Sequence, residues 1–194
     1  MAEQKIDRPY TVEEYLAMEL AEPEAKYEYV DGVLYNMTGG TIQHGLLISN
    51  ALYWIKAGIR EKGLPCKTFG GDVKVLVEEA NAYLYPDVFV VCGKIDDRKH
   101  PNQAIRNPKL IVEVLSKSTQ GYDHSQKFRL YRSNPDFEEY VMIDQEKALI
   151  ESYYRISEDH WQISTIIGLD KSLELRSLEL AIAMKDLYED VLSQ

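Results

Sequence analysis

Apolar and polar residues alternate along the chain with periods that predict helices and strands in turn. Thr11 and Glu14 have the spacing of a capping box and predict a short helix that begins there. Apolar residues at helical spacing predict a long amphipathic helix over 41–60. Shorter helical patterns predict a helix over 123–133 and a last one over 178–192.

The predicted strands form a hairpin, a buried centre and a meander. Alternating runs around Asp31-Gly32 predict a β-hairpin over 27–30 and 33–37, because Asp-Gly suits the tight turn. The run 110–115 is apolar except at one residue, which is typical of a central strand covered on both faces. Further strands are expected over 73–77, 85–91, 139–144, 149–156 and 161–167, the last three as an antiparallel meander, with the charged segment 94–107 as a surface loop. This order predicts an α/β or α+β fold, a mixed β-sheet flanked by helices, in a single domain over 1–194.

The composition narrows the classes of protein. Among 194 residues, 22 Lys and Arg stand against 32 Asp and Glu, giving a formal charge of −10. Proteins that coat nucleic acid are usually basic, so an enzyme acting on nucleic acid would need a local basic patch or a metal. No apolar run approaches the roughly 20 residues of a membrane-spanning helix, and the N-terminus lacks a signal-peptide pattern. We expect a cytoplasmic protein in which Cys66 and Cys92 are thiols.

Several common catalytic motifs are missing. The sequence contains no GxxxxGK[ST], GxGxxG, HExxH or GxSxG motif. Its four histidines are dispersed, which gives little support to a histidine-based zinc site.

Two carboxylates in apolar strands are the first candidates for chemistry. Glu113 lies within the run 110–115, and Asp87 lies within 85–91. Burying an unpaired carboxylate costs several kcal/mol, on the order of the penalty for an isolated ion, so such residues are paired, protonated or metal-bound. Two carboxylates on neighbouring strands can hold a hard cation such as Mg²⁺. The alternative is that Glu113 faces solvent on an edge strand and Asp87 caps a turn.

Lys127 is the third candidate. It precedes Leu130 and Tyr131 by three and four residues, so it shares their helix face and is expected to point toward the sheet. The alternative is an exposed Asp123–Lys127 pair that contributes only a few tenths of a kcal/mol.

The order of several short motifs resembles the Uma2 family of restriction-endonuclease-like proteins, within the PD-(D/E)XK nuclease superfamily. These motifs are Pro86-Asp87, Glu113-Val114-Leu115-Ser116, Ser118-Thr119, Asp123, Lys127, Tyr131 and Glu139-Tyr140, with Tyr27-Glu28-Tyr29-Val30-Asp31-Gly32 and His44 earlier in the chain. The resemblance runs from about Tyr10 to Leu187. It implies a restriction-endonuclease-like mixed sheet.

The resemblance also implies roles for individual residues. Asp87 and Glu113 would bind Mg²⁺, with Mn²⁺ as a substitute. The superfamily lysine usually follows the acid by two residues, where this chain has Leu115, and the family places it on the next helix, which matches Lys127. Lys117 is a rival for that role.

Two earlier residues have open roles. Glu28 would be a further carboxylate near the metal, or else an exposed hairpin residue. His44 would take part in the site, or else be a helix-start residue.

The implied activity is metal-dependent hydrolysis of DNA phosphodiester bonds, with Lys127 stabilising the transition state. A symmetric homodimer would supply two active sites for the two strands of a duplex. The alternatives are a catalytically silent binding or assembly module with a nuclease fold, and a carboxylate-pair hydrolase acting on sugars, which would not require an inward lysine. The sequence leaves DNA and RNA open as substrates.

Overall fold

The computed structural model describes residues 2–4, 8–22, 24–37, 39–99, 104–116 and 126–192. Its helices are α1 (Val12–Ala21), α2 (Ile42–Glu61), the 3-10 turn η1 (Glu78–Ala80), α4 (Phe128–Tyr131) and α5 (Met184–Leu187). Its strands are β1 (Ala2–Gln4), β2 (Tyr27–Val30), β3 (Val33–Asn36), β4 (Cys66–Gly70), β5 (Lys74–Val77), β6 (Ala82–Leu84), β7 (Val88–Cys92), β8 (Ala104–Ile105), β9 (Leu110–Leu115), β10 (Glu139–Asp144), β11 (Leu149–Ser157), β12 (His160–Ile167), β13 (Ser172–Leu175) and β14 (Leu180–Ala183).

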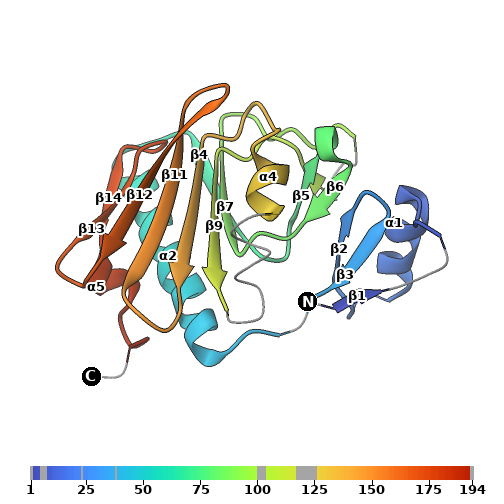
Figure 1. The fold of residues 1–194 in the computed structure, drawn as a ribbon. Coiled ribbons are helices and arrows are strands. Elements are labelled where there is room, and N and C mark those ends of the chain that lie inside the picture. Colours follow the sequence, from blue (N-terminus) through green and yellow to red (C-terminus); the bar gives the residue numbers. More distant parts are fainter. Residues whose placement is uncertain are drawn as a thin grey trace.

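In the described part of the chain, the strands form two large sheets and one small one (Figure 1). The first sheet has the order β1-β3-β2-β6-β5-β8, and the second has the order β12-β11-β10-β9-β7-β4. Strand β10 runs parallel to β9, whereas β7 and β11 run antiparallel to their neighbours, so the second sheet is mixed. The predicted class, a mixed β-sheet flanked by helices, is confirmed.

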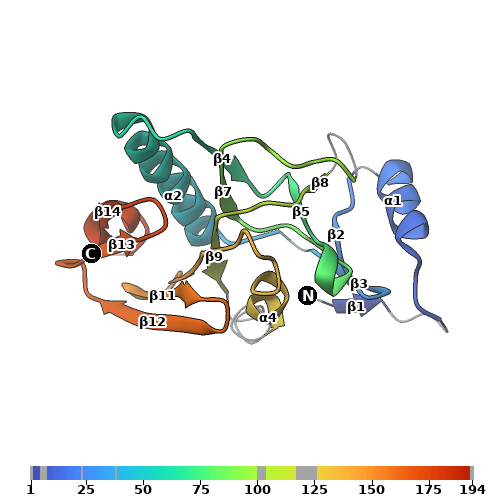
Figure 2. The ribbon, with the colours of Figure 1, turned by 90° about the horizontal axis from the view of Figure 1, so that it is seen from above.

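Helices α2 and α4 lie on opposite faces of the second sheet (Figure 2). Alternate residues of β7 and β9 therefore enter different hydrophobic clusters, because successive side chains of a strand point to opposite faces. Val88 and Val112 join the cluster under α2, and Phe89 and Ile111 join the cluster on the α4 side. The run 110–115 is buried throughout, as expected for a covered central strand.

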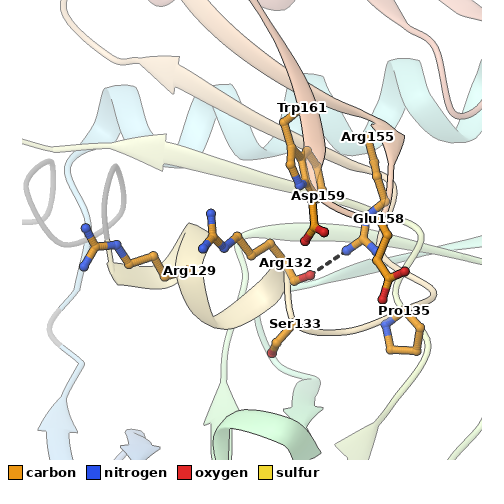
Figure 3. A pocket seen from close by; sticks show the side chains of 8 residues that line it. All are labelled: Arg129, Arg132, Ser133, Pro135, Arg155, Glu158, Asp159 and Trp161. Carbon is orange, nitrogen blue, oxygen red and sulfur yellow. Dashed lines mark hydrogen bonds between the residues drawn. The ribbon is translucent and has the colours of Figure 1, made fainter.

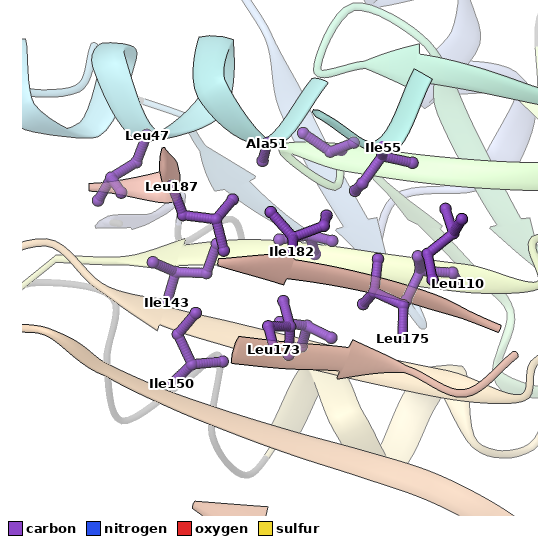
Figure 4. Packing of buried hydrophobic residues seen from close by; sticks show 14 of the residues in the cluster. Leu47, Ala51, Ile55, Leu110, Ile143, Ile150, Leu173, Leu175, Ile182 and Leu187 are labelled. Atoms are coloured by element: carbon purple, nitrogen blue, oxygen red, sulfur yellow. The ribbon is translucent and has the colours of Figure 1, made fainter. Parts of the chain in front are cut away.

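The cluster under α2 also includes the small β13–β14 sheet (Figure 4). Leu173 and Leu175 of β13 lie directly opposite Ile182 and Leu180 of β14, and all four are buried. The sequence-based expectation of one helix over 178–192 is therefore wrong. Leu and Ile recur at every second residue of β13 and β14, and in β14 this strand period overlaps with the helical spacing read over 178–192. In the described chain, the short helix α5 is the helix that follows β14.

Other elements match the sequence more closely. Helix α1 has the predicted capping box, with the Thr11 hydroxyl accepting from the backbone N–H of Glu14. The predicted hairpin is β2–β3, and its turn residues Asp31 and Gly32 have φ angles of 45° and 90°. The expected loop 94–107 contains β8, a short strand that pairs parallel to β5.

Cys66 and Cys92 form a disulfide, so the expectation of two thiols is wrong. A separation of 26 residues in sequence does not indicate that the two cysteines meet. They meet because β4 pairs antiparallel with β7, and this register places Cys66 directly opposite Cys92. Disulfides are uncommon in reducing compartments, so the bond lends no support to the cytoplasmic location, which stays a prediction. No described helix has the length and apolar character needed to span a membrane.

Candidate active site

Asp87 and Glu113 lie opposite one another where β7 begins beside β9. Val88 pairs with Val112, so the same antiparallel register sets Asp87 against Glu113 on one face of the sheet. The backbone N–H of Asp87 donates to Glu113 Oε2 at 3.4 Å, and the backbone N–H of Val114 donates to Asp87 Oδ2 at 2.7 Å. Glu113 is 3% exposed on a strand between two neighbours, so the edge-strand alternative is wrong.

Lys127 lies at the start of α4 with its side chain turned toward the sheet, as its helix position predicts. The residue is 4% exposed, and its Nζ lies 3.1 Å from Glu113 Oε1 and 3.0 Å from Glu28 Oε1. The alternative of an exposed surface pair is therefore wrong for Lys127. Asp123 and the rival Lys117 lie outside the described residues.

Glu28 brings the first sheet into the site. It lies on β2 and is fully buried, so it is not an exposed hairpin residue. Its Oε1 also accepts a hydrogen bond from the backbone N–H of Tyr85 at 3.0 Å, on the segment that connects β6 with β7. One carboxylate oxygen thus holds both the Lys127 ammonium and the chain just before Asp87.

Two further side chains contact the carboxylates. His44 lies in the first turn of α2, where Thr41 caps the helix, and its Nε2 is 3.2 Å from Asp87 Oδ1. The hydroxyl of Tyr131 donates to Glu113 Oε1 at 3.4 Å. Burial raises the pKa of Tyr131 well above its usual value, so the phenol keeps its proton and remains a donor.

The sequence pattern alone does not find these two contacts. A histidine at a helix start and a tyrosine on an apolar helix face are ordinary local features. The pattern favours a helix-start role for His44 and is explained as well by core packing for Tyr131. Their position relative to the carboxylates depends on how α2 and α4 pack against the second sheet, so only the family resemblance signalled His44.

The paired carboxylates are the part of the site that could hold a metal ion. The described residues contain no group of three or more His, Cys, Asp or Glu side chains arranged to hold one. Mg²⁺ needs fewer protein ligands, since one or two carboxylates with water and substrate oxygens complete its octahedron. Each oxygen of an ionised carboxylate has two lone-pair sites, so Asp87 and Glu113 can keep the hydrogen bonds above and still ligate. The pair fits a hard divalent cation.

Known proteins resemble this chain in sequence and in fold. The profile of the Uma2 family, described as "Putative restriction endonuclease", matches residues 12–185. Two uncharacterized proteins of Synechocystis sp., slr1290 and sll1609, are 36% and 30% identical over 176 and 170 residues, covering 91% and 88% of this chain and 90% and 94% of their own. The crystal structure of a "putative nuclease belonging to DUF820" from Anabaena variabilis superposes with a TM-score of 0.72 at 18% identity, over 95% of this chain and all of that one.

The structural likeness shows that this chain has the fold of the Anabaena variabilis protein, and the sequence matches show its family. The matched region contains all the residues that meet at the paired carboxylates: Glu28, His44, Asp87, Glu113, Lys127 and Tyr131. This chain is a member of the Uma2 family.

Proposed function

We propose that the protein is a metal-dependent endonuclease that hydrolyses phosphodiester bonds of DNA, with Asp87 and Glu113 as the ligands of Mg²⁺ or Mn²⁺. Membership of the Uma2 family and the nuclease fold support the general class. One observation supports the specific site: two carboxylates oppose one another at a strand start, and the ammonium of Lys127 lies against one of them.

The chain's own residues can position and stabilise the reacting groups. A divalent cation, when bound, supplies a Lewis acid and lowers the pKa of a bound water. Lys127 is held at Glu113, where its positive charge can stabilise the negative charge that develops on the phosphate oxygens. His44 and the backbone N–H of Val114 fix the orientation of Asp87, and Tyr131 does the same for Glu113.

Glu28 has a different role in this proposal from the one implied by the resemblance. Its contact is with the Lys127 ammonium, at 3.0 Å, and with the backbone of Tyr85. We assign it to the catalytic set as the residue that holds Lys127, and assign the metal to Asp87 and Glu113.

A cleavage assay with matched variants tests the proposal. Plasmid DNA, single-stranded DNA and RNA are incubated with the wild-type chain in Mg²⁺, Mn²⁺ or EDTA. We expect cleavage of DNA that EDTA abolishes, and a loss of about 10²–10³ in rate for Lys127→Met, typical of removing one charge-stabilising group. Asp87→Asn and Glu113→Gln should also weaken Mg²⁺ binding measured by calorimetry, whereas the exposed control Glu174→Gln should leave both properties unchanged.

The outcomes separate the alternatives. Absence of cleavage with either metal, in a folded chain that binds nucleic acid, would overturn the proposal and favour a silent binding module. Cleavage that persists in Lys127→Met and disappears in Lys117→Met would assign the lysine role to Lys117.

We further propose that the active form is a homodimer that contacts its second copy through β12. This strand is at an edge of the second sheet, and Ile163 and Ile167 on it are 61% and 65% exposed. An open strand edge beside exposed isoleucines is a surface that associates readily. A two-fold dimer would also provide one active site for each strand of a duplex.

A further inference from the structure

An open cleft lies between the outer face of α4 and the β11–β12 hairpin, away from the paired carboxylates (Figure 3). Its volume is about 690 Å³. Arg129 and Arg132 extend from α4, and Arg155 and Trp161 belong to β11 and β12. We call it the arginine cleft.

The guanidinium groups of Arg129, Arg132 and Arg155 form no salt bridge with a described carboxylate. Arg8, Arg98 and Arg106 do form such salt bridges. Three unpaired arginines around one cleft are notable in a chain whose formal charge is −10. Their charge is therefore available to a ligand.

Arg155 is held rigidly at the base of the cleft. Its Nη2 donates to the backbone carbonyls of Arg132 and Asn134 at 2.6 and 2.9 Å, and its guanidinium stacks over the Trp161 ring at 4.9 Å from the centroid. Its buried Nε has no hydrogen-bond acceptor among the described residues. Burial lowers the pKa of Arg155 from its usual value, because water is displaced from around the charge. The charges of Glu138 and Glu158 offset part of this effect, and a bound anion would offset more of it.

The arginine cleft is connected to the candidate active site through a single turn of helix. Lys127 precedes α4 and points inward, whereas Arg129 and Arg132 are exposed on the outer side. Lys127 and the two arginines project from opposite sides of this helix, which with its side chains is about 10–12 Å across. That distance is about three steps of a duplex strand at 3.4 Å of helix axis per phosphate. A strand that reaches the carboxylates could therefore place phosphates a few nucleotides away near the cleft.

Two carboxylates in the lining oppose such a ligand. Glu158 and Asp159 are exposed in the turn of the β11–β12 hairpin and line the same cleft. They reduce the positive potential of the cleft without pairing with its arginines. Neutralising the arginines of the cleft should therefore weaken anion binding, and neutralising its two carboxylates should strengthen it.

We propose that the arginine cleft binds the phosphate groups of the nucleic-acid strand that flank the scissile position; this inference rests on the proposed nuclease function. Guanidinium groups bind phosphate by charge-assisted, often bidentate hydrogen bonds. Trp161, braced by Arg155, adds an aromatic wall against which a base can stack. Phosphate contacts of this kind position the strand and carry no sequence specificity.

Binding is measured by fluorescence anisotropy of a labelled single-stranded oligonucleotide and its duplex, with the wild-type chain in EDTA so that nothing is cleaved. We expect the Arg129→Gln/Arg132→Gln double variant to bind about tenfold more weakly or worse. The slope of log affinity against log salt should fall by about 1.5, since each lost phosphate contact removes about 0.7–0.9. The Glu158→Gln/Asp159→Asn variant should bind more tightly than the wild type.

The charge-matched control is Lys171→Gln/Lys185→Gln, which removes two positive charges beside β13 and in α5, the elements packed under α2. Its affinity and salt slope should stay close to the wild-type values. Equal losses in the control and the arginine variant would overturn the proposal, since they would mean that only net charge matters. Displacement of the oligonucleotide by polyglutamate at equal charge would also overturn it, by showing a site for any polyanion.

Plasmid cleavage by the same variants shows whether the arginine cleft, the nuclease activity or both are absent. Wild-type affinity in the arginine variant, with cleavage intact, would overturn the arginine cleft and leave the nuclease standing. Weakened binding in the arginine variant of a chain that cleaves nothing would support the cleft and overturn the nuclease. A wild-type chain that binds neither oligonucleotide would overturn the cleft.

Discussion

The buried ammonium of Lys127 contributes to the stability of the fold, in addition to its proposed role in the reaction. It lies between Glu28 and Glu113, and all three residues are at most 4% exposed. Removing one partner of a buried ion pair typically costs about 3–5 kcal/mol, because a buried charge is left uncompensated. We expect Lys127→Met to lower the free energy of unfolding by about this amount, as measured by urea denaturation.

Further variants show whether the loss of stability in Lys127→Met comes from the unpaired buried carboxylates. The deficit should shrink in Glu28→Gln/Lys127→Met, because one of the two carboxylates that lose their partner is then neutral. Lys26→Ala, which removes an exposed ion pair with Asp72, should cost less than about 1 kcal/mol. A Lys127→Met variant as stable as Lys26→Ala would contradict the buried pair.

Glu139 on β10 is a further buried carboxylate, and its hydrogen bonds link β10 to the segment between β13 and β14. It accepts hydrogen bonds from Ser152, from the backbone N–H of Arg176 and from both the N–H and hydroxyl of Ser177. Burial raises the pKa of Glu139 above its usual value, although these donors act in the opposite direction. The native state therefore holds the proton of Glu139 more tightly than the unfolded state does.

The sign of the resulting pH dependence follows from proton linkage. A raised native pKa contributes stability that is fully present below the ordinary carboxyl pKa of about 4.3, and that is lost as pH rises through the native pKa. The difference in unfolding free energy between the wild type and Glu139→Gln should thus decrease across the pH range above the ordinary carboxyl pKa. Urea denaturation of both chains across this range measures it, and a difference that grows with pH would refute the assignment.

At the residue scale, the sequence predicts the site in part. Glu113 and Lys127 could be found because a charged residue on an apolar strand or helix face needs a partner. Glu28 and His44 could not be placed from the pattern, because each comes from a distant element whose packing against the second sheet no local period encodes.

Among the elements, α2 contains two glycines with different surroundings. An added Cβ at Gly58 would lie 2.9 Å from Leu180 Cδ2, whereas at Gly45 it would meet nothing within 4 Å apart from its chain neighbours and the backbone of its own helix. Alanine is favoured over glycine in a helix by about 0.5–1 kcal/mol. Gly45→Ala should therefore stabilise the chain by about that amount, and Gly58→Ala should gain nothing or destabilise it. Thermal unfolding of the two variants measures the difference; an equal gain in both would show that Leu180 moves away freely.

The disulfide gives the edge strand β4 a covalent tie to β7. Closing a loop of 26 residues restricts the unfolded chain. In the chain-entropy model this restriction is worth about 3 kcal/mol for a loop of this size. Reduction by dithiothreitol should lower the free energy of unfolding by about that amount in the wild type and leave Cys66→Ser/Cys92→Ser unchanged. If dithiothreitol also lowered the free energy of unfolding of the double variant, its effect would not come from the Cys66–Cys92 bond.

Element boundaries were predictable where one period dominates. The helix expected over 41–60 matches α2, and the run 110–115 coincides with β9. The prediction failed over 178–192, where strand and helix periods overlap within a few residues, and it missed the pairing of Cys66 with Cys92, which depends on the register between strands.

For the molecule as a whole, the proposed dimer makes a measurable prediction. Analytical ultracentrifugation should find twice the chain mass at micromolar concentration, and Ile163→Lys/Ile167→Lys should sediment as a single chain. Leu20→Lys alters an apolar residue on α1 that is even more exposed, at 77%, and should not change the mass. A wild type that sediments as one chain would contradict the dimer.

The Cys66–Cys92 bond fixes the alignment of a strand next to the candidate site. A strand displaced by one residue turns every side chain to the opposite face, so a displaced β7 would move Cys92 from its place opposite Cys66. Once formed, the bond therefore holds β7 in its native register against β4. Asp87 directly precedes β7, so the chain at this carboxylate is tied covalently to the edge strand of the second sheet.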